Sequence, residues 1–132
     1  MQKGGMLNSS IAKVLADLGH TDTIVIGDCG LPVPAGVQKI DLALKPGTPS
    51  FLEVVEEVAK NMVIEKVEIA AEMEGKNPDV FVAMKKLFSN EEWIIDANHE
   101  AFKEATRHAK CVIRTGEITP FANVILHSNV FF

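Results

Sequence analysis

Short apolar runs rich in β-branched residues alternate along this chain with segments of helical periodicity, which limits the folds open to it. The run at residues 23–28, Thr-Ile-Val-Ile-Gly-Asp, has the length and composition of a buried strand. Further strands are predicted from runs at residues 37–44, 63–71, 93–95, 111–113 and 124–126. Because helices separate most of these strands, we expect an α/β domain with helices on both faces of a sheet.

Four amphipathic helices are expected between the strands. The first covers residues 11–18, follows the capping residues Asn8, Ser9 and Ser10 and stops at Gly19. The second is opened by Pro49 at its first helical position. Asn77 and Asn98 are expected to cap the third and fourth.

The length and charge of the chain narrow its class. Its 132 residues fit one domain spanning residues 1–132, without linker or repeat. The formal net charge is −5 and the basic residues are scattered, so nucleic acid is not an expected partner. No window approaches the ~20 apolar residues of a membrane span and no secretory signal is recognisable. We therefore expect a cytoplasmic protein that has no membrane partner.

Motifs that indicate a bound cofactor or metal are absent from the sequence. It contains no glycine-rich nucleotide loop, no nucleophile elbow and no histidine pair at metal-ligand spacing. Cys29 and Cys111 form no paired motif and are interpreted as buried hydrophobic residues, although Cys29 adjoins a candidate site residue. With no cofactor and no metal expected, chemistry would depend on the four histidines and nearby carboxylates.

Two candidate site residues flank the first predicted strand. His20 lies in a loop after Gly19, a common place for catalytic groups, but a histidine stabilised by the preceding helix dipole is the alternative. Asp28 ends the strand, where ligands of α/β sheets bind, but an aspartate that closes a turn at Gly30 is the alternative. An extended chain between the two spans up to ~26 Å. They share a pocket only if the chain folds back after Gly19 or another subunit supplies one of them.

The other histidines differ in their surroundings. His99 follows the cap Asn98, in the first helical turn, where the dipole favours a neutral imidazole that both donates and accepts hydrogen bonds. An exposed first-turn residue is the alternative. His108 is interpreted as a solvated residue and His127 as a structural one.

The segment at residues 113–123 follows a strand and is rich in turn formers. In it, Phe121 and Asn123 flank the small residue Ala122. An aromatic ring stacks on the apolar face of a sugar, and an amide hydrogen-bonds its hydroxyls. A purely structural loop is the alternative.

Several stretches together resemble the ribose pyranase and fucose mutarotase family. They are Gly-Met-Leu-Asn-Ser at 5–9, Leu-Ala-Asp-Leu-Gly-His-Thr-Asp at 15–22, Asp-Cys-Gly-Leu-Pro-Val-Pro at 28–34, Arg-Thr-Gly-Glu at 114–117 and Thr-Pro-Phe-Ala-Asn at 119–123. The likeness covers essentially the whole chain. It implies a three-layer α/β/α sandwich, a homodecamer of two stacked pentameric rings and a site between subunits.

The resemblance also implies an activity and a set of site residues. The activity is cofactor-free acid–base interconversion of the β-pyranose and β-furanose forms of free D-ribose. The family's proton donor falls on His20, and its substrate-binding positions fall on Asp28, His99, Phe121, Ala122 and Asn123. The family often has Tyr where this chain has Phe121, and this chain contains no Tyr. The stacking ring is kept, but one hydroxyl hydrogen bond, worth about 1 kcal/mol net, is lost.

Three other functions are compatible with these residues. A fucose-type mutarotase would prefer a six-carbon deoxy sugar. A sugar-binding or transport-associated subunit would bind sugar without accelerating the exchange of its ring forms. An interaction protein whose ring is its function would bind no sugar.

Overall fold

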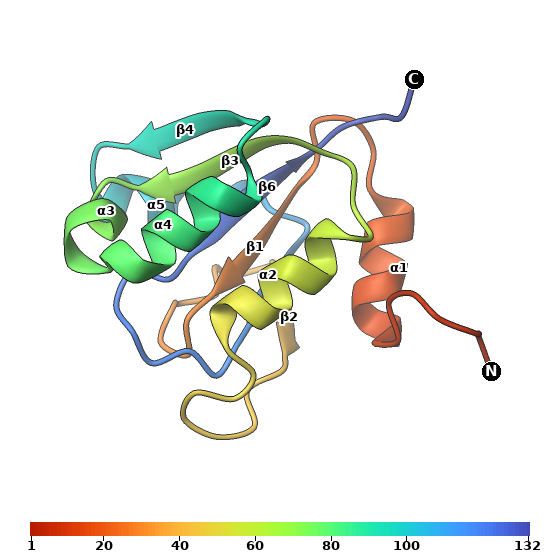
Figure 1. Cartoon of the computed structure of the whole chain (residues 1–132). Coiled ribbons are helices and arrows are strands. Elements are labelled where there is room, and N and C mark those ends of the chain that lie inside the picture. The colour runs from red at the N-terminus through yellow and green to blue at the C-terminus, as the bar shows by residue number, and fades with distance from the viewer.

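Six strands form one mixed sheet in the computed structural model, which describes residues 1–132. They are β1 (Thr23–Gly27), β2 (Gln38–Asp41), β3 (Ile64–Ala70), β4 (Glu92–Asp96), β5 (Cys111–Arg114) and β6 (Val124–Ser128). Their order across the sheet is β2-β5-β1-β6-β3-β4 (Figure 1). Every pairing is parallel except those of β6, which runs antiparallel to β1 and β3. The α/β class and all the predicted strands are confirmed.

Helices cover both faces of this sheet and make three layers. One face carries α1 (Ser9–Asp17), α2 (Phe51–Ala59), α3 (Glu72–Lys76) and α4 (Pro78–Leu87). The other carries α5 (His99–Ala105) and the 3-10 helix η1 (Thr106–His108). The core under the first group joins 20 buried residues and the core on the other face joins 7, so the two helical layers are unequal. None of these helices is long and apolar enough to cross a membrane.

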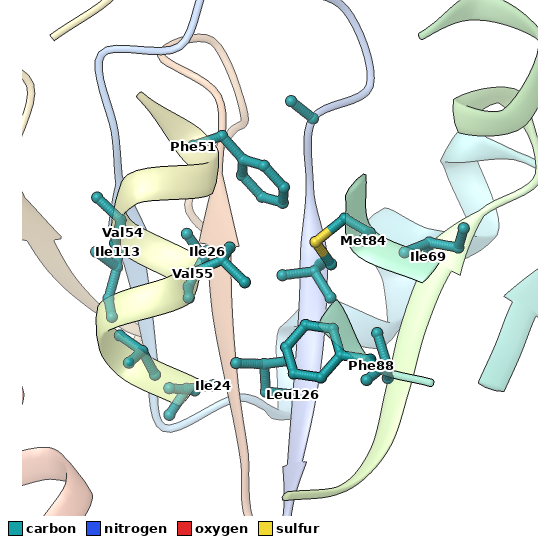
Figure 2. Close-up of a cluster of buried hydrophobic side chains, with 14 of the residues drawn as sticks. Ile24, Ile26, Phe51, Val54, Val55, Ile69, Met84, Phe88, Ile113 and Leu126 are labelled. Atoms are coloured by element: carbon teal, nitrogen blue, oxygen red, sulfur yellow. The ribbon is translucent and has the colours of Figure 1, made fainter. Parts of the chain in front are cut away.

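Alternate strand residues enter the two cores, because successive side chains of a strand point to opposite faces. In β1, Ile24 and Ile26 belong to the larger core and Val25 to the smaller one. Figure 2 shows Phe51 and Val55 of α2 lying over this strand. Burying one such side chain is worth about 1.5–3 kcal/mol relative to exposure. A one-residue shift of β1 would reverse the two faces, so packing determines its register.

Two of the predicted helix caps are confirmed. Asn8 Oδ1 accepts a hydrogen bond from the N–H of Ile11 at 3.0 Å, and Asn98 Oδ1 accepts one from Ala101 at 2.8 Å. Each satisfies a backbone donor that the first helical turn leaves without a partner.

The starts of α2 and α4 differ from the prediction. Pro49 is not the first residue of α2, because the Ser50 hydroxyl caps the helix by accepting the N–H of Glu53 at 3.2 Å, and α2 starts two residues later, at Phe51. Asn77 does not cap α4 with its side chain, which is buried and donates to Thr119 Oγ1 at 2.9 Å and to the Pro120 carbonyl at 2.8 Å. The short helix α3 was not predicted.

A glycine after β5 allows two loops to approach closely. The Gly116 carbonyl accepts the Gly47 N–H at 2.6 Å, and the Gly116 N–H donates to the Pro49 carbonyl at 2.8 Å. A Cβ at Gly116 would lie 2.2 Å from the carbonyl oxygen of Thr48 and 2.6 Å from its nitrogen. Since backbone atoms cannot rotate away, any larger residue must displace the segment that leads into α2.

We predict that Gly116→Ala lowers the free energy of unfolding by about 1–3 kcal/mol, the cost typical of overpacking. Urea unfolding at one fixed protein concentration measures the effect. Gly75→Ala is the control, because a Cβ at that position of α3 meets nothing within 4 Å and alanine favours helix. Equal stability of Gly116→Ala and wild type would contradict the close approach.

Candidate functional site

Asp28 and Asn123 meet where β1 ends and the antiparallel β6 begins. This side of the sheet, at the carboxyl ends of its parallel strands, is called the Asp28 edge. Asn123 Oδ1 accepts the Asp28 N–H at 2.9 Å, and Asn123 Nδ2 donates to Asp28 Oδ2 at 3.1 Å. Asn123 is only 3% exposed, so both contacts are shielded from water. A Cβ at Gly27 would lie 3.0 Å from Asn123 Oδ1, and the glycine leaves room for the amide. Asn123 therefore holds Asp28 in one position.

The Asp28 carboxylate also closes the turn that was one of its two interpretations. Its Oδ1 accepts the N–H of Gly30 at 2.9 Å. The side chain is half-buried, and each carboxylate oxygen can accept a second hydrogen bond. Asp28 is thus a turn residue whose remaining acceptor capacity faces the edge of the sheet.

His99 and Phe121 form the aromatic part of this edge. Their rings meet edge to face with centroids 5.3 Å apart, and the His99 ring stacks on Phe102 at 6.2 Å. The backbone N–H of His99 donates to Glu72 Oε2 at 2.7 Å. Nδ1 of His99 is buried and makes no hydrogen bond within the chain. Because buried polar atoms normally have partners, this unpaired nitrogen is an exception within the chain.

Phe121 adopts an unusual backbone conformation. Its φ is 57°, in the left-handed region that bulky residues seldom occupy. The Asn123 N–H donates to its carbonyl at 2.9 Å, and Asn77 holds the preceding residues. Ala122 is 0% exposed and packs in the larger core, so only its backbone can reach a ligand.

His20 lies at the opposite edge, where the parallel strands of the sheet begin. It sits in a turn in which the Asp22 N–H donates to the Gly19 carbonyl at 3.2 Å. The four residue steps of β1 alone separate Thr23 from Gly27 by ~13 Å. The chain does not fold back after Gly19, so one protomer does not bring His20 to Asp28. Of the six predicted site residues, the structure gathers Asp28, His99, Phe121, Ala122 and Asn123 at one edge and leaves His20 at the other.

The structure records two non-glycine residues with positive φ, Thr21 at 73° and Phe121 at 57°. Such conformations cost about 1–3 kcal/mol each and cluster at functional sites. Thr21 follows His20, and Phe121 belongs to the residues gathered around Asp28. Both edges therefore carry backbone strain beside the predicted site residues.

Sequence reasoning did not identify the residues that support this site. Glu117 Oε1 accepts the Phe51 N–H at 3.0 Å, and its Oε2 accepts the Thr119 hydroxyl at 2.9 Å, which ties the loop before Phe121 to the start of α2. Glu72, which holds the backbone of His99, lies in the unpredicted helix α3. Glu117 lies within a stretch that resembles the family, whereas no sequence signal identified Glu72.

A hollow of about 300 Å³ adjoins Asp28 through Cys29. Its lining residues are Cys29, Ala43, Leu44, Lys45, Pro46, Arg114, Gly116 and Ile118. Cys29 is only half-buried and lines this hollow, so its interpretation as a buried residue was wrong. Cys111 is buried as predicted, and burial raises the pKa of its thiol to about 12.

A second titratable cluster joins Glu68 on β3, His127 on β6 and Asp96 at the end of β4. Glu68 Oε2 on β3 lies 2.8 Å from Nε2 of His127 on β6, which supports the structural interpretation of this histidine. Burial opposes ionisation of Glu68, but the interactions with His127 and Asp96 together outweigh it and lower the pKa of Glu68. Burial and the neighbouring Glu68 raise the pKa of Asp96 to about 7. His108 is exposed, as predicted.

Solved structures share this three-layer arrangement. Bacillus subtilis RbsD complexed with D-ribose superposes with a TM-score of 0.97 at 54% identity, covering 100% of both chains. A fucose mutarotase in complex with L-fucose from Streptococcus pneumoniae has a TM-score of 0.80 at 19% identity, covering 99% of this chain and 100% of that chain. The fold therefore places the chain in a class of small α/β proteins with solved examples that hold free sugars.

The family follows from the sequence match. The model of the RbsD / FucU transport protein family matches residues 1–131, and the chain belongs to this family. Among curated relatives, the D-ribose pyranase of Exiguobacterium sibiricum is 58% identical over 132 residues. The D-ribose pyranase of Bacillus licheniformis is 61% identical over 132 residues. Both matches cover 100% of each chain.

The raised pKa of Asp96 predicts a pH-dependent stability. Between the ordinary aspartate value of 3.8 and about 7, the folded chain retains a proton that the unfolded chain has released, so stability falls as pH rises through this window. Asp96→Asn cannot ionise and should be more stable than wild type by about 1 kcal/mol at pH 8, with little difference near pH 4.

Urea unfolding at several pH values, at fixed protein concentration, measures this difference. Asp79→Asn, an exposed position in the first turn of α4, is the matched control. Parallel pH profiles for Asp96→Asn and wild type would rule out a proton held by Asp96.

Proposed function

We propose that this protein is a D-ribose pyranase, an isomerase that interconverts the β-pyranose and β-furanose forms of free D-ribose. The observation that carries the proposal is full-length identity of 58% and 61% to proteins named D-ribose pyranase. The likeness to a relative solved with D-ribose supports the same substrate. The fucose mutarotase is a distant relative at 19% identity, which makes an L-fucose-type activity the weaker alternative.

The reaction needs only proton transfers. The anomeric hydroxyl gives its proton to solvent water, the bond between the anomeric carbon and the ring oxygen breaks, and the ring oxygen gains a proton from His20. A different hydroxyl of the open-chain aldehyde then attacks the carbonyl carbon, which changes a six-membered ring into a five-membered one. In this closure the attacking hydroxyl returns a proton to His20, and the former carbonyl oxygen takes one from water. Positioned acid–base groups contribute about 10²–10⁴-fold. That acceleration suffices for a reaction that already proceeds slowly in water, so the proposal includes neither cofactor nor metal.

The edge of the sheet that carries Asp28 supplies the sugar contacts. The Asp28 carboxylate accepts hydrogen bonds from sugar hydroxyls, and the His99 imidazole forms a further hydrogen bond with a hydroxyl. The Phe121 ring stacks on the apolar face of the sugar. Asn123 has two of its hydrogen bonds committed to Asp28, so its main role is to orient that carboxylate. Ala122 contributes through its backbone.

A complete site requires two subunits, because one chain keeps His20 and Asp28 at opposite edges of its sheet. We place His20 of one subunit against the Asp28 edge of its neighbour, in a homodecamer of two pentameric rings in the cytoplasm. Exposed apolar side chains support such contacts: Leu44 and Ile118 near the Asp28 edge are 78% and 64% exposed, and Phe131 is 89% exposed. The Thr21 N–H donates to the Ser128 carbonyl. The segment that follows Ser128 and carries Phe131 therefore begins beside the His20 turn (Figure 1).

The first test is saturation-transfer proton NMR on equilibrated D-ribose. Wild type should accelerate pyranose–furanose exchange, and His20→Ala should lose about 10²–10⁴-fold of that acceleration. His108→Ala, at an exposed histidine outside the site, is the matched control. Acceleration that persists in His20→Ala removes His20 as proton donor. Binding of ribose without any acceleration by wild type favours the transport-associated subunit, and faster exchange of L-fucose than of ribose favours the fucose-type enzyme.

Mixing two inactive variants tests whether the site spans subunits. His20→Ala and Asp28→Ala, unfolded together and refolded at equal concentration, should recover about one quarter of wild-type activity, since random assembly gives both intact residues to that fraction of sites. Each variant refolded alone is the control. If the mixture stays inactive while size-exclusion chromatography shows mixed oligomers, His20 and Asp28 act within one chain.

A further inference from the structure

We propose that Glu65 positions His20 by accepting a hydrogen bond from Nε2–H, which leaves Nδ1 as the nitrogen that exchanges a proton with the sugar. The inference rests on the proposed function, because it assigns a partner to the proposed proton donor. Glu65 belongs to β3, which lies two strands away from β1 in the sheet.

The distance between the two side chains supports this role. Nε2 of His20 lies 3.5 Å from Oε1 of Glu65, with the two side chains 48% and 34% exposed. The contact is an ion pair when His20 is protonated, and it is longer than a usual hydrogen bond. Catalytic hydrogen bonds that are long in a free enzyme tighten when the substrate binds. Nδ1 of His20 makes no hydrogen bond within the chain, so it remains free for substrate.

A β-bulge directs Glu65 toward this position. In the pairing of β3 with β6, Ile64 faces Ser128 and Lys66 faces His127, so Glu65 is an extra residue on β3. Bulges interrupt the regular alternation of a strand and re-aim a side chain, often next to active sites. Glu65 therefore does not follow the alternation of the rest of β3.

The same bulge lies opposite the anchor of the His20 turn. The carbonyl of Ser128 accepts the N–H of Thr21 at 3.2 Å, and the φ of Thr21 is 73°. The β3–β6 pairing therefore holds the bulged Glu65 and the strained His20 turn against each other. A strained conformation persists only where the surrounding structure determines it.

The nearest carboxylate along the chain on the strand side of His20, that of Asp22, has other partners. Asp22 Oδ2 accepts the Gly19 N–H at 2.8 Å, and Asp22 Oδ1 lies 3.8 Å from Nζ of Lys110. Lys66 and Glu68 of β3 pair with Glu92 and His127 of the two neighbouring strands. Each of those groups has its own partner, which leaves Glu65 to the His20 imidazole.

A carboxylate at one imidazole nitrogen determines the chemistry of the other. The two ring nitrogens are distinct, and the hydrogen bond made by one decides which of them carries the proton in the neutral ring. With Nε2–H directed at Glu65, Nδ1 of the neutral ring is the acceptor and Nδ1–H of the charged ring is the donor. The ring also loses the freedom to turn away from the sugar.

The test compares Glu65→Ala and Glu65→Gln with wild type. Glu65→Ala should lower kcat for ribose exchange about 10-fold, a fraction of what a positioned acid–base group contributes, while KM stays within about 2-fold. Glu65→Gln should retain more activity, because its carbonyl oxygen still accepts Nε2–H. Glu57→Ala removes another partly exposed glutamate, paired with Lys60 on α2, and should match wild type.

A spectroscopic measurement separates positioning from a structural effect. Long-range ¹H–¹⁵N spectra of histidine-labelled protein, with the His20 signals assigned from His20→Ala, show which nitrogen is protonated. Wild type should show the Nε2–H form, and Glu65→Ala should show a mixture of tautomers with His127 signals unchanged. An unchanged tautomer, or an unchanged kcat, in Glu65→Ala overturns the proposal.

These outcomes are distinct from failure of the proposed function. If wild type does not accelerate ribose exchange, the pyranase proposal fails, and the tautomer of His20 still decides whether Glu65 orients its ring. If wild type is active and requires His20 but Glu65→Ala is equally active with the same tautomer, only the role of Glu65 is lost.

Discussion

The last strand, β6, pairs antiparallel with β1 and β3 in the centre of an otherwise parallel sheet. Its two ends hold the two groups of predicted site residues in place. At its start, Asn123 fixes the Asp28 carboxylate through two hydrogen bonds. At its end, the Ser128 carbonyl anchors the turn that carries His20. The hydrophobic residues between these ends enter both cores, so burial of the strand holds the two polar ends at a fixed separation.

That separation explains why such a small chain is expected to work as an assembly. The apolar cores occupy the middle of the sheet, and the predicted site residues lie at its two edges. A strand cannot shorten to bring its ends together, because its rise per residue is set by the backbone. A neighbouring molecule can supply the opposite edge, and exposed apolar side chains such as Leu44 and Phe131 are then buried between subunits.

Much of the fold followed from local patterns, and the exceptions have local causes. The strands and the caps Asn8 and Asn98 could be predicted because strand composition and capping depend on neighbouring residues. The roles of Ser50 and Asn77 could not, because either of two adjacent polar residues can cap a helix, and the partners of Asn77 lie in a loop about forty residues away. The site residues came largely from the family resemblance, since single histidines and a turn aspartate are compatible with several roles.

The sequence by itself determined the α/β class, the number of strands and the identity of the chemistry-bearing side chains, because periodicity and residue type are local properties. Only the tertiary structure decided that Asp28, His99, Phe121 and Asn123 converge at one edge, that His20 does not join them, and that a bulge turns Glu65 toward His20. These relations depend on strand order, direction and register, which arise from contacts between residues far apart in the chain and leave no local signature in it.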